Sequence, residues 1–145
     1  MKVNKIKKED AVLLVVDFQE RLMPSIKDYD TLGQTTAKLI KGCRILSVPI
    51  IVTQQYTKGL GETIPVLKAA LEDADYDLIE KTSFSCLGEP TFLEALQKTE
   101  KKTVLVTGIE SHICVQQTVI DLQENGYNVF LIIKDWRVAC LMVLD

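Results

Sequence analysis

Three side chains that could carry out nucleophilic chemistry each follow a short apolar run in this 145-residue sequence. Asp17 follows the run AVLLVV, Lys81 follows DYDLIE, and Cys114 follows TVLVTG at the start of a stretch with helical spacing. A thiolate attacks carbonyl carbons, a carboxylate takes up and returns the thiol proton, and an ammonium stabilises the thiolate. Taken singly, these residues are more simply a helix cap, a solvated lysine and a small core residue. Together they predict a nucleophilic cysteine site.

The chemistry gives each of the three residues a role. We expect Cys114 to be the nucleophile, Asp17 to shuttle its proton, and Lys81 together with a helix N-terminus to hold the sulfur as a thiolate. Backbone N–H groups around Ile113 and Cys114 should bind a developing oxyanion, at roughly 3 to 4 kcal/mol of barrier per donor. A sulfur more than about 8 Å from both charged groups would lie beyond useful electrostatic reach and refute the hypothesis.

These residues need a scaffold that brings distant segments together, and the apolar pattern predicts one. Short β-branched runs predict strands at 11–16, 49–52, 103–106 and 128–133, with a weaker strand at 76–80, and helical spacing predicts helices at 32–46, 64–71, 90–96 and 114–124. This alternation predicts an α/β fold with an open, mainly parallel sheet, helices on both faces and a Rossmann-like three-layer architecture. Ligands bind beyond the carboxyl ends of such strands, where the three reactive residues should converge.

Composition supports one globular domain over residues 1–145, with 47% apolar and 26% charged residues. The net charge of −3 argues against a nucleic-acid partner, and no apolar run approaches the roughly 18 to 20 residues that cross a bilayer. Cysteines Cys43, Cys86, Cys114 and Cys140 form no CxxC pair, and His112 is the one histidine. We therefore expect a cytoplasmic protein with no metal, cofactor or membrane partner.

The motifs resemble one known family. The order of Asp17 in VVDFQ, Lys81 in EKTSFSC and Cys114 in VTGIESHICVQQT is similar to the isochorismatase-like superfamily of cysteine hydrolases, over about residues 8–135. The segment QQYTKGLGETIP resembles the subgroup of isochorismatase-domain-containing proteins. The resemblance implies an Asp, Lys, Cys triad on a parallel α/β sheet.

The resemblance also implies a cis peptide between Ile109 and Glu110 that aims backbone N–H groups at the oxyanion. Two departures from the motifs of characterised family members narrow the class of substrate. Nicotinamidases of the superfamily carry histidine metal ligands after the second strand, where this chain has Gln54, Gln55 and Tyr56. True isochorismatases typically lack the cysteine that this chain has at the nucleophile position. A metal-dependent nicotinamidase and an enol-ether hydrolase are both disfavoured.

Five further residues are candidates for the substrate pocket: Gln19, Gln54, Gln55, Tyr56 and His112. The glutamines and the tyrosine fit an ordinary polar loop equally well. His112 as an alternative base would need a non-helical turn, because residues two apart on a helix do not face each other; we interpret it as a rim residue. Cys86 is five residues beyond the lysine of the triad, and we interpret it as a structural thiol.

The sequence ends KDWRVACLMVLD, where the family usually continues with a helix, another strand and a last helix. We therefore expect a C-terminally incomplete domain lacking the last strand and helices, through truncation, a frameshift near Asp135 or a natural short form. The final residues show neither helical nor alternating spacing. Exposed apolar faces would then favour a homo-oligomer.

The leading hypothesis is a metal-independent cysteine hydrolase that cleaves a small amide-like or ester-like substrate, most simply at a C–N bond, through a thioester intermediate. The alternatives are a non-catalytic α/β binding module, an inactive truncated family member, and a redox thiol, which the lack of an obvious resolving cysteine disfavours.

Overall fold

One sheet of six strands forms the centre of the molecule in a computed structural model that describes residues 5–109, 111–133 and 137–140. The strands are β1 Ala11–Val16, β2 Ile50–Gln55, β3 Asp77–Lys81, β4 Thr103–Gly108, β5 Asn128–Ile133 and β6 Arg137–Cys140. The helices are α1 Tyr29–Ile45, α2 Thr57–Leu60, α3 Pro65–Ala70, α4 Pro90–Lys98 and α5 Gln116–Glu124. The predicted α/β class with an open, mainly parallel sheet is confirmed.

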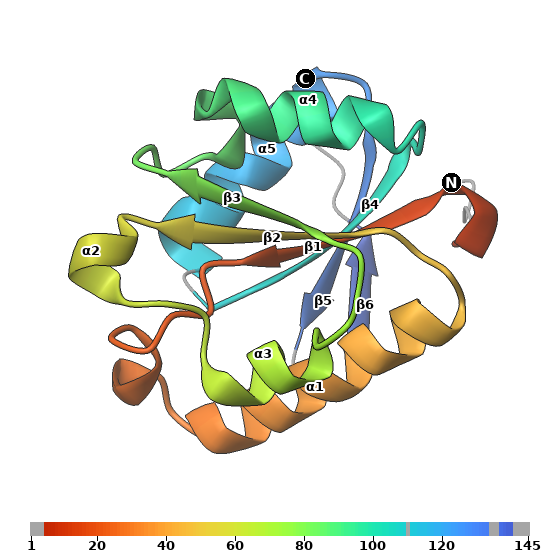
Figure 1. The fold of residues 1–145 in the computed structure, drawn as a ribbon. Coiled ribbons are helices and arrows are strands. Elements are labelled where there is room, and N and C mark those ends of the chain that lie inside the picture. Colours follow the sequence, from red (N-terminus) through yellow and green to blue (C-terminus); the bar gives the residue numbers. More distant parts are fainter. Residues whose placement is uncertain (1–4, 110, 134–136, 141–145) are drawn as a thin grey trace.

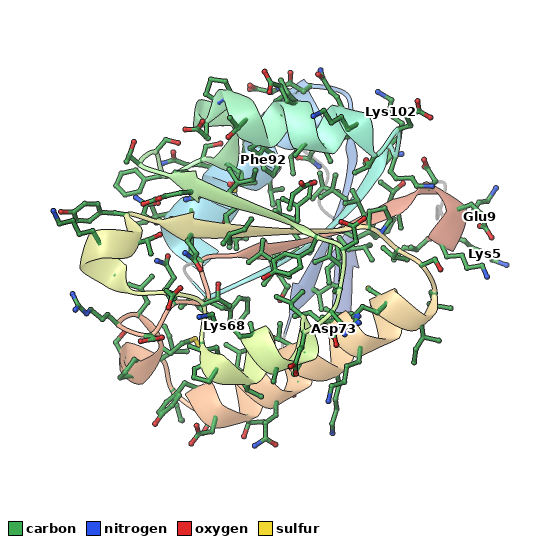
Figure 2. All side chains as sticks on the ribbon, in the orientation of Figure 1. Lys5, Glu9, Lys68, Asp73, Phe92 and Lys102 are labelled. Carbon is green, nitrogen blue, oxygen red and sulfur yellow. The ribbon has the colours of Figure 1, made fainter. Side chains whose placement is uncertain are left out.

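Helices cover both faces of the sheet, α1 and α3 on one side and α4 and α5 on the other (Figure 1). All six residues of β1 are buried, because a central parallel strand is covered on both faces. Leu13 and Val15 pack in the core under α1 and α3, whereas Leu14 and Val16 pack in the core under α4 and α5. Phe92 of α4 points toward the sheet in this second core (Figure 2).

The helix boundaries follow local signals in the sequence. Pro65 and Pro90 begin α3 and α4, at the position where a missing N–H costs nothing. Gly126, with φ of +86°, ends α5: its N–H donates to the Gln123 carbonyl, and the Tyr127 N–H donates to the Leu122 carbonyl. This is the Schellman arrangement, in which glycine is favoured at the position of positive φ.

The strand order is β3-β2-β1-β4-β5-β6, with β1 to β5 parallel. The chain runs outward from β1 through β2 to β3, and then returns to the other side of β1 with β4 and β5. Strand order therefore reverses between β1 and β4, and the crevice beyond their carboxyl ends is where open α/β sheets bind ligands.

The sequence analysis assigned no element to residues 137–140, but the structure has β6 there, antiparallel to β5. Four residues without alternating spacing give no local strand signal; pairing with β5 defines the strand. In the part of the chain that the structure describes, no helix has the length and apolar character needed to cross a bilayer.

Candidate active site

Asp17 is the first residue after β1 and is fully buried. Strict alternation would place its side chain with Leu13 and Val15, but its φ of +55° turns the chain at this point. The Asp17 carboxylate instead accepts a hydrogen bond from the Thr53 hydroxyl at 2.8 Å and one from the Lys81 ammonium at 2.9 Å. Aspartate is among the few residue types that tolerate a positive φ, so the turn aims the carboxylate into the site at small cost.

Lys81 is the last residue of β3, and its side chain is buried. Its ammonium donates to Asp17 and to the Gln55 side-chain oxygen, at 2.9 and 2.7 Å, and to the carbonyls of Ser83 and Phe84, both at 3.0 Å. These four acceptors fix the position of the ammonium. Lys81 thus supplies a positioned positive charge rather than a mobile one.

Cys114 lies in a π-helical turn, Ser111–Val115, that connects β4 to α5. The turn packs closely on the sheet at Gly108, where a Cβ would lie 2.5 Å from Val115 and 3.1 Å from Val16. The thiol is 6% exposed, and it lies 3.8 Å from the Gln55 side-chain oxygen. Single π-helical turns inside longer helices often occur at functional sites.

The three predicted residues therefore meet beyond the carboxyl ends of β1, β3 and β4. The Cys114 thiol donates a hydrogen bond to the Gln55 side-chain oxygen at 3.8 Å, and the charges of Asp17 and Lys81 both act on the thiol. The Lys81 nitrogen lies 2.7 Å from the same Gln55 oxygen, so it is at most about 6.5 Å from the sulfur, inside the limit of about 8 Å stated above.

The predicted thiolate is wrong for this structure. Burial, followed by the Asp17 carboxylate, raises the pKa of the Cys114 thiol from its ordinary value of 9.0 to about 12, although the Lys81 ammonium lowers it. Desolvation and a like charge both disfavour a second anion beside Asp17. Cys114 is thus a neutral thiol at neutral pH, and the charge of the Asp17 carboxylate acts on it.

A second thiol lies beside the site. Cys86 is fully buried, and burial raises its pKa to about 11 while Thr118 and Lys81 lower it. The Thr118 hydroxyl accepts from the Cys86 N–H at 3.0 Å and donates to the Cys114 carbonyl. This single hydroxyl ties the segment after β3 to the turn that carries the nucleophile.

Two of the predicted pocket residues, Gln19 and Gln54, form hydrogen bonds with the loop that follows β2. Gln19 donates to the carbonyls of Gln55 and Gly61 at 2.9 and 2.8 Å. The side-chain oxygen of Gln54 accepts from the backbone and hydroxyl of Thr63, both at 2.9 Å. A contact of Gln19 or Gln54 with substrate stays a prediction, since their amides hold the loop that follows β2.

The other predicted site residues are distributed around this centre. Tyr56 is exposed, and its N–H donates to the Lys81 carbonyl at 3.0 Å. Ile109 is buried and Ile113 is exposed. The Ile109–Glu110 peptide and the His112 side chain lie outside the described part of the chain. Among the described residues, no group of three or more histidine, cysteine or acidic side chains gathers as a metal site.

Residues 11–134 match the family model described as the isochorismatase domain, which covers most of the chain and the whole candidate site. The chain belongs to this family. The match confirms the resemblance expected from the three motifs.

Relatives in the isochorismatase family extend beyond this chain. Isochorismatase family protein 1A of Dictyostelium discoideum is 39% identical over 135 residues, covering 90% of this chain and 64% of that protein. A solved structure described as MAR1 ribonuclease from Caenorhabditis elegans has a TM-score of 0.81 and 40% identity, covering 89% of this chain and 65% of that one. An Escherichia coli structure described as an octameric hydrolase of unknown specificity has a TM-score of 0.80 and 25% identity, covering 91% and 66%. This chain spans about two thirds of the length of these relatives.

Sequence reasoning missed Thr53 and underrated Gln55. These residues are two apart on β2, so both face the triad, and Gln55 is opposite Lys81 in the sheet register. The alignment of β2 with β3 could have identified both residues. When the two strands are aligned at their carboxyl ends, the polar residues of β2 on the same face as Lys81 become candidates for the active site.

Proposed function

We propose that this chain carries the active site of a cysteine hydrolase that cleaves small amide-like or ester-like substrates through a thioester intermediate. The observation that supports it is the buried Asp17–Lys81 ion pair beside the Cys114 thiol, with Gln55 accepting hydrogen bonds from both Lys81 and the thiol at the carboxyl edge of the sheet. Burying an ion pair is costly, and replacing such a pair by apolar residues is often neutral or stabilising. A charged pair with a thiol at its edge is therefore better explained by chemistry than by stability.

The first half-reaction forms the thioester. Cys114 Sγ bonds to the substrate carbonyl carbon while its proton passes to the Asp17 carboxylate. Backbone N–H groups around Ile113 and Cys114 bind the oxyanion of the tetrahedral intermediate. The bond to the amine or alcohol then breaks, and the proton on Asp17 moves to the departing nitrogen or oxygen.

The second half-reaction restores the enzyme. Water adds to the thioester carbon and gives a proton to Asp17, the carbon–sulfur bond breaks, and the proton returns to the Cys114 sulfur. The Lys81 charge stabilises whichever of the carboxylate or the sulfur is anionic at each stage. Neither half-reaction requires a group from outside the triad other than water and backbone donors.

The proposal is tested by acylation with p-nitrophenyl acetate and identification of the acetylated cysteine by mass spectrometry. Cys43 is the internal control, because it is also buried and burial raises its pKa to about 11, below that of Cys114. If the fraction of ionised thiol alone set the rate, Cys43 would be acetylated faster than Cys114. Faster acetylation of Cys114 therefore supports assistance by Asp17.

A Cys114→Ala variant should lose the acetylated peptide and all ester hydrolysis. Equal or slower acetylation of Cys114 than of Cys43 would contradict the nucleophilic role. It would leave the non-catalytic binding module, or an inactive family member, as the better description.

RNA is a second candidate substrate, because the 40% identical Caenorhabditis elegans neighbour is described as a ribonuclease. The site argues against it: the Lys81 ammonium already has four acceptors, and the chain carries a net charge of −3. Phosphate binding generally relies on free lysines or arginines. Cleavage of a labelled RNA by the wild type and not by Cys114→Ala would favour this second function over the first.

We further propose self-association, in line with the octameric Escherichia coli hydrolase. Large apolar side chains are exposed on β3 and beside it, including Leu78 and Phe84, at 51% and 52%. A monomer in sedimentation at micromolar concentration would contradict this. The buried free thiols Cys43, Cys86 and Cys114 suit the reducing cytoplasm that we propose as the location.

A further inference from the structure

Gln55 lies between the two reactive partners at the end of β2. Its side-chain oxygen accepts a hydrogen bond from the Lys81 ammonium at 2.7 Å and a longer one from the Cys114 thiol at 3.8 Å. An ammonium offers only hydrogens, so the atom that faces Lys81 must be the amide oxygen. The amide orientation is thereby fixed, with its –NH₂ group directed away from Lys81.

The backbone of Gln55 is held independently of its side chain. Its N–H donates to the Gln19 side-chain oxygen at 2.7 Å, and its carbonyl accepts from the Gln19 –NH₂ group at 2.9 Å. Gln19 is itself fully buried. The position of residue 55 is therefore set by Gln19 and by the β2–β3 register, and it does not depend on the Gln55 amide.

Lys81 does not need the Gln55 side chain to satisfy its hydrogen bonds. An ammonium has three hydrogens, whereas Lys81 has four acceptors: Gln55, Asp17, and the carbonyls of Ser83 and Phe84. Without the Gln55 oxygen, three acceptors would remain for three hydrogens. Satisfying the lysine thus does not explain the glutamine.

The –NH₂ group of Gln55 bonds to none of the residues that the structure describes, and the side chain is half-buried. The amide nitrogen and oxygen are on the order of 2 Å apart, given standard C=O and C–N bond lengths, which puts the nitrogen within about 6 Å of the sulfur. An acyl group bonded to that sulfur would lie within reach of this donor.

We propose that Gln55 is a substrate-binding residue, and that its –NH₂ group donates a hydrogen bond to an acceptor oxygen on the acyl part of the substrate. Lys81 orients the donor through the amide oxygen. The inference rests on the proposed function and narrows it to carbonyl compounds that carry, besides the carbonyl oxygen itself, a second oxygen acceptor within two bonds of the carbon that the sulfur attacks.

Two alkylating reagents of similar size separate substrate contact from effects on the thiol. Iodoacetamide delivers a carboxamide oxygen next to the sulfur, whereas 1-iodopropane delivers none. The measured quantity is the ratio of the two rates of Cys114 modification, by peptide mass spectrometry, because any change in thiol ionisation affects both rates alike and cancels.

Gln55→Met removes the donor and keeps the side-chain length, and we expect the ratio to fall about fivefold, the worth of one net hydrogen bond. Gln55→Glu keeps an oxygen for Lys81 but has no donor, so its ratio should fall as well. Gln97→Met, at an exposed position of α4, is the matched control and should leave the ratio unchanged.

An unchanged ratio in both Gln55 variants overturns the proposal, and so does an equal fall in both rates, which would place Gln55 in the electrostatics of the thiol. If Gln55→Met fails to fold, the Gln55→Glu ratio decides. The proposed function fails separately, if wild-type Cys114 shows no preference over Cys43 in the acetylation assay.

Discussion

Replacing the two charged members of the triad should move the Cys114 thiol pKa in opposite directions while both replacements abolish hydrolysis. Asp17→Asn removes a negative charge that raises the thiol pKa. At an effective dielectric constant near 20, a unit charge roughly 4 to 6 Å away is worth about 3 to 4 kcal/mol, or about two to three pKa units. The pKa of Cys114, about 12 in the wild type, should therefore fall into a range that can be titrated.

Lys81→Met should have the reverse effect on the thiol. The Lys81 nitrogen and the Cys114 sulfur are 2.7 and 3.8 Å from the same Gln55 oxygen, so they are no more than about 6.5 Å apart, where a unit charge is worth about 2.5 kcal/mol. Losing the ammonium should raise the thiol pKa still further. Hydrolysis should fall by about 10² to 10⁴ in Asp17→Asn, because the proton acceptor is gone.

The assay is the thiolate ultraviolet absorption between pH 7 and 10, measured against the same variant carrying Cys114→Ala to subtract the other thiols. Asparagine accepts a positive φ as aspartate does, so Asp17→Asn should keep the turn after β1. Asp73→Asn is the matched control: Asp73 is exposed, has φ of +61°, and lies between α3 and β3 (Figure 2). An unchanged or higher thiol pKa in Asp17→Asn would refute the idea that the Asp17 carboxylate raises the pKa of the thiol.

Further predictions concern pH and two glycines. The pKa values of Cys43, Cys86 and Cys114 are raised in the folded protein, so the thiols of the unfolded chain ionise at lower pH than those of the folded protein. The free energy of unfolding should therefore fall as pH rises from 9 to 11. The fall should be at most about 1.4 kcal/mol per pH unit for each thiol. Urea titrations at several pH values measure the slope, which Cys43→Ala should reduce. Gly108→Ala would put a Cβ 2.5 Å from a Val115 methyl, so it should destabilise the fold by roughly 1 to 3 kcal/mol and slow Cys114 acetylation. Gly126→Ala meets no atom within 4 Å but has φ of +86°, so it should cost about 1 kcal/mol and leave acetylation unchanged; slower acetylation would link the end of α5 to the site. Hydrolysis in the wild type should not rise with the ionisation of Cys114 above pH 9, and a rise would indicate attack by a thiolate formed in solution equilibrium.

Apolar runs predicted the strands best where a strand contains only apolar residues. The β1 limits match the prediction at both ends, whereas β2 extends through Gln55 and β4 through Gly108. Among the extra residues of β2, Thr53 and Gln54 are polar but buried, because their polar atoms find partners, Thr53 with Asp17 and Gln54 with Thr63. A strand predicted from apolar residues alone stops where these paired polar residues begin, so the prediction is too short at the end of the strand that carries the candidate site.

The convergence of Asp17, Lys81 and Cys114 followed from topology, since the carboxyl ends of parallel strands share an edge. The charge state of the Cys114 sulfur could not be predicted from topology. It depends on how deeply the thiol is buried and on which of Asp17 and Lys81 is nearer, and residue spacing specifies neither. The π-helical turn was missed for a similar reason, because its residues 111–115 continue smoothly into the helical spacing of α5.

The neutral thiol is consistent with a nucleophile once the charge of the whole site is counted. With Asp17 ionised, Lys81 protonated and Cys114 neutral, the triad has no net charge. Releasing the thiol proton to solvent would leave two buried anions beside one cation, and burial makes that state expensive. Passing the proton to Asp17 keeps the net charge at zero, because the thiolate then takes over the carboxylate's place beside the ammonium. The same groups that raise the thiol pKa thus make internal proton transfer the cheaper route, and the sulfur gains its charge only as it bonds to the substrate.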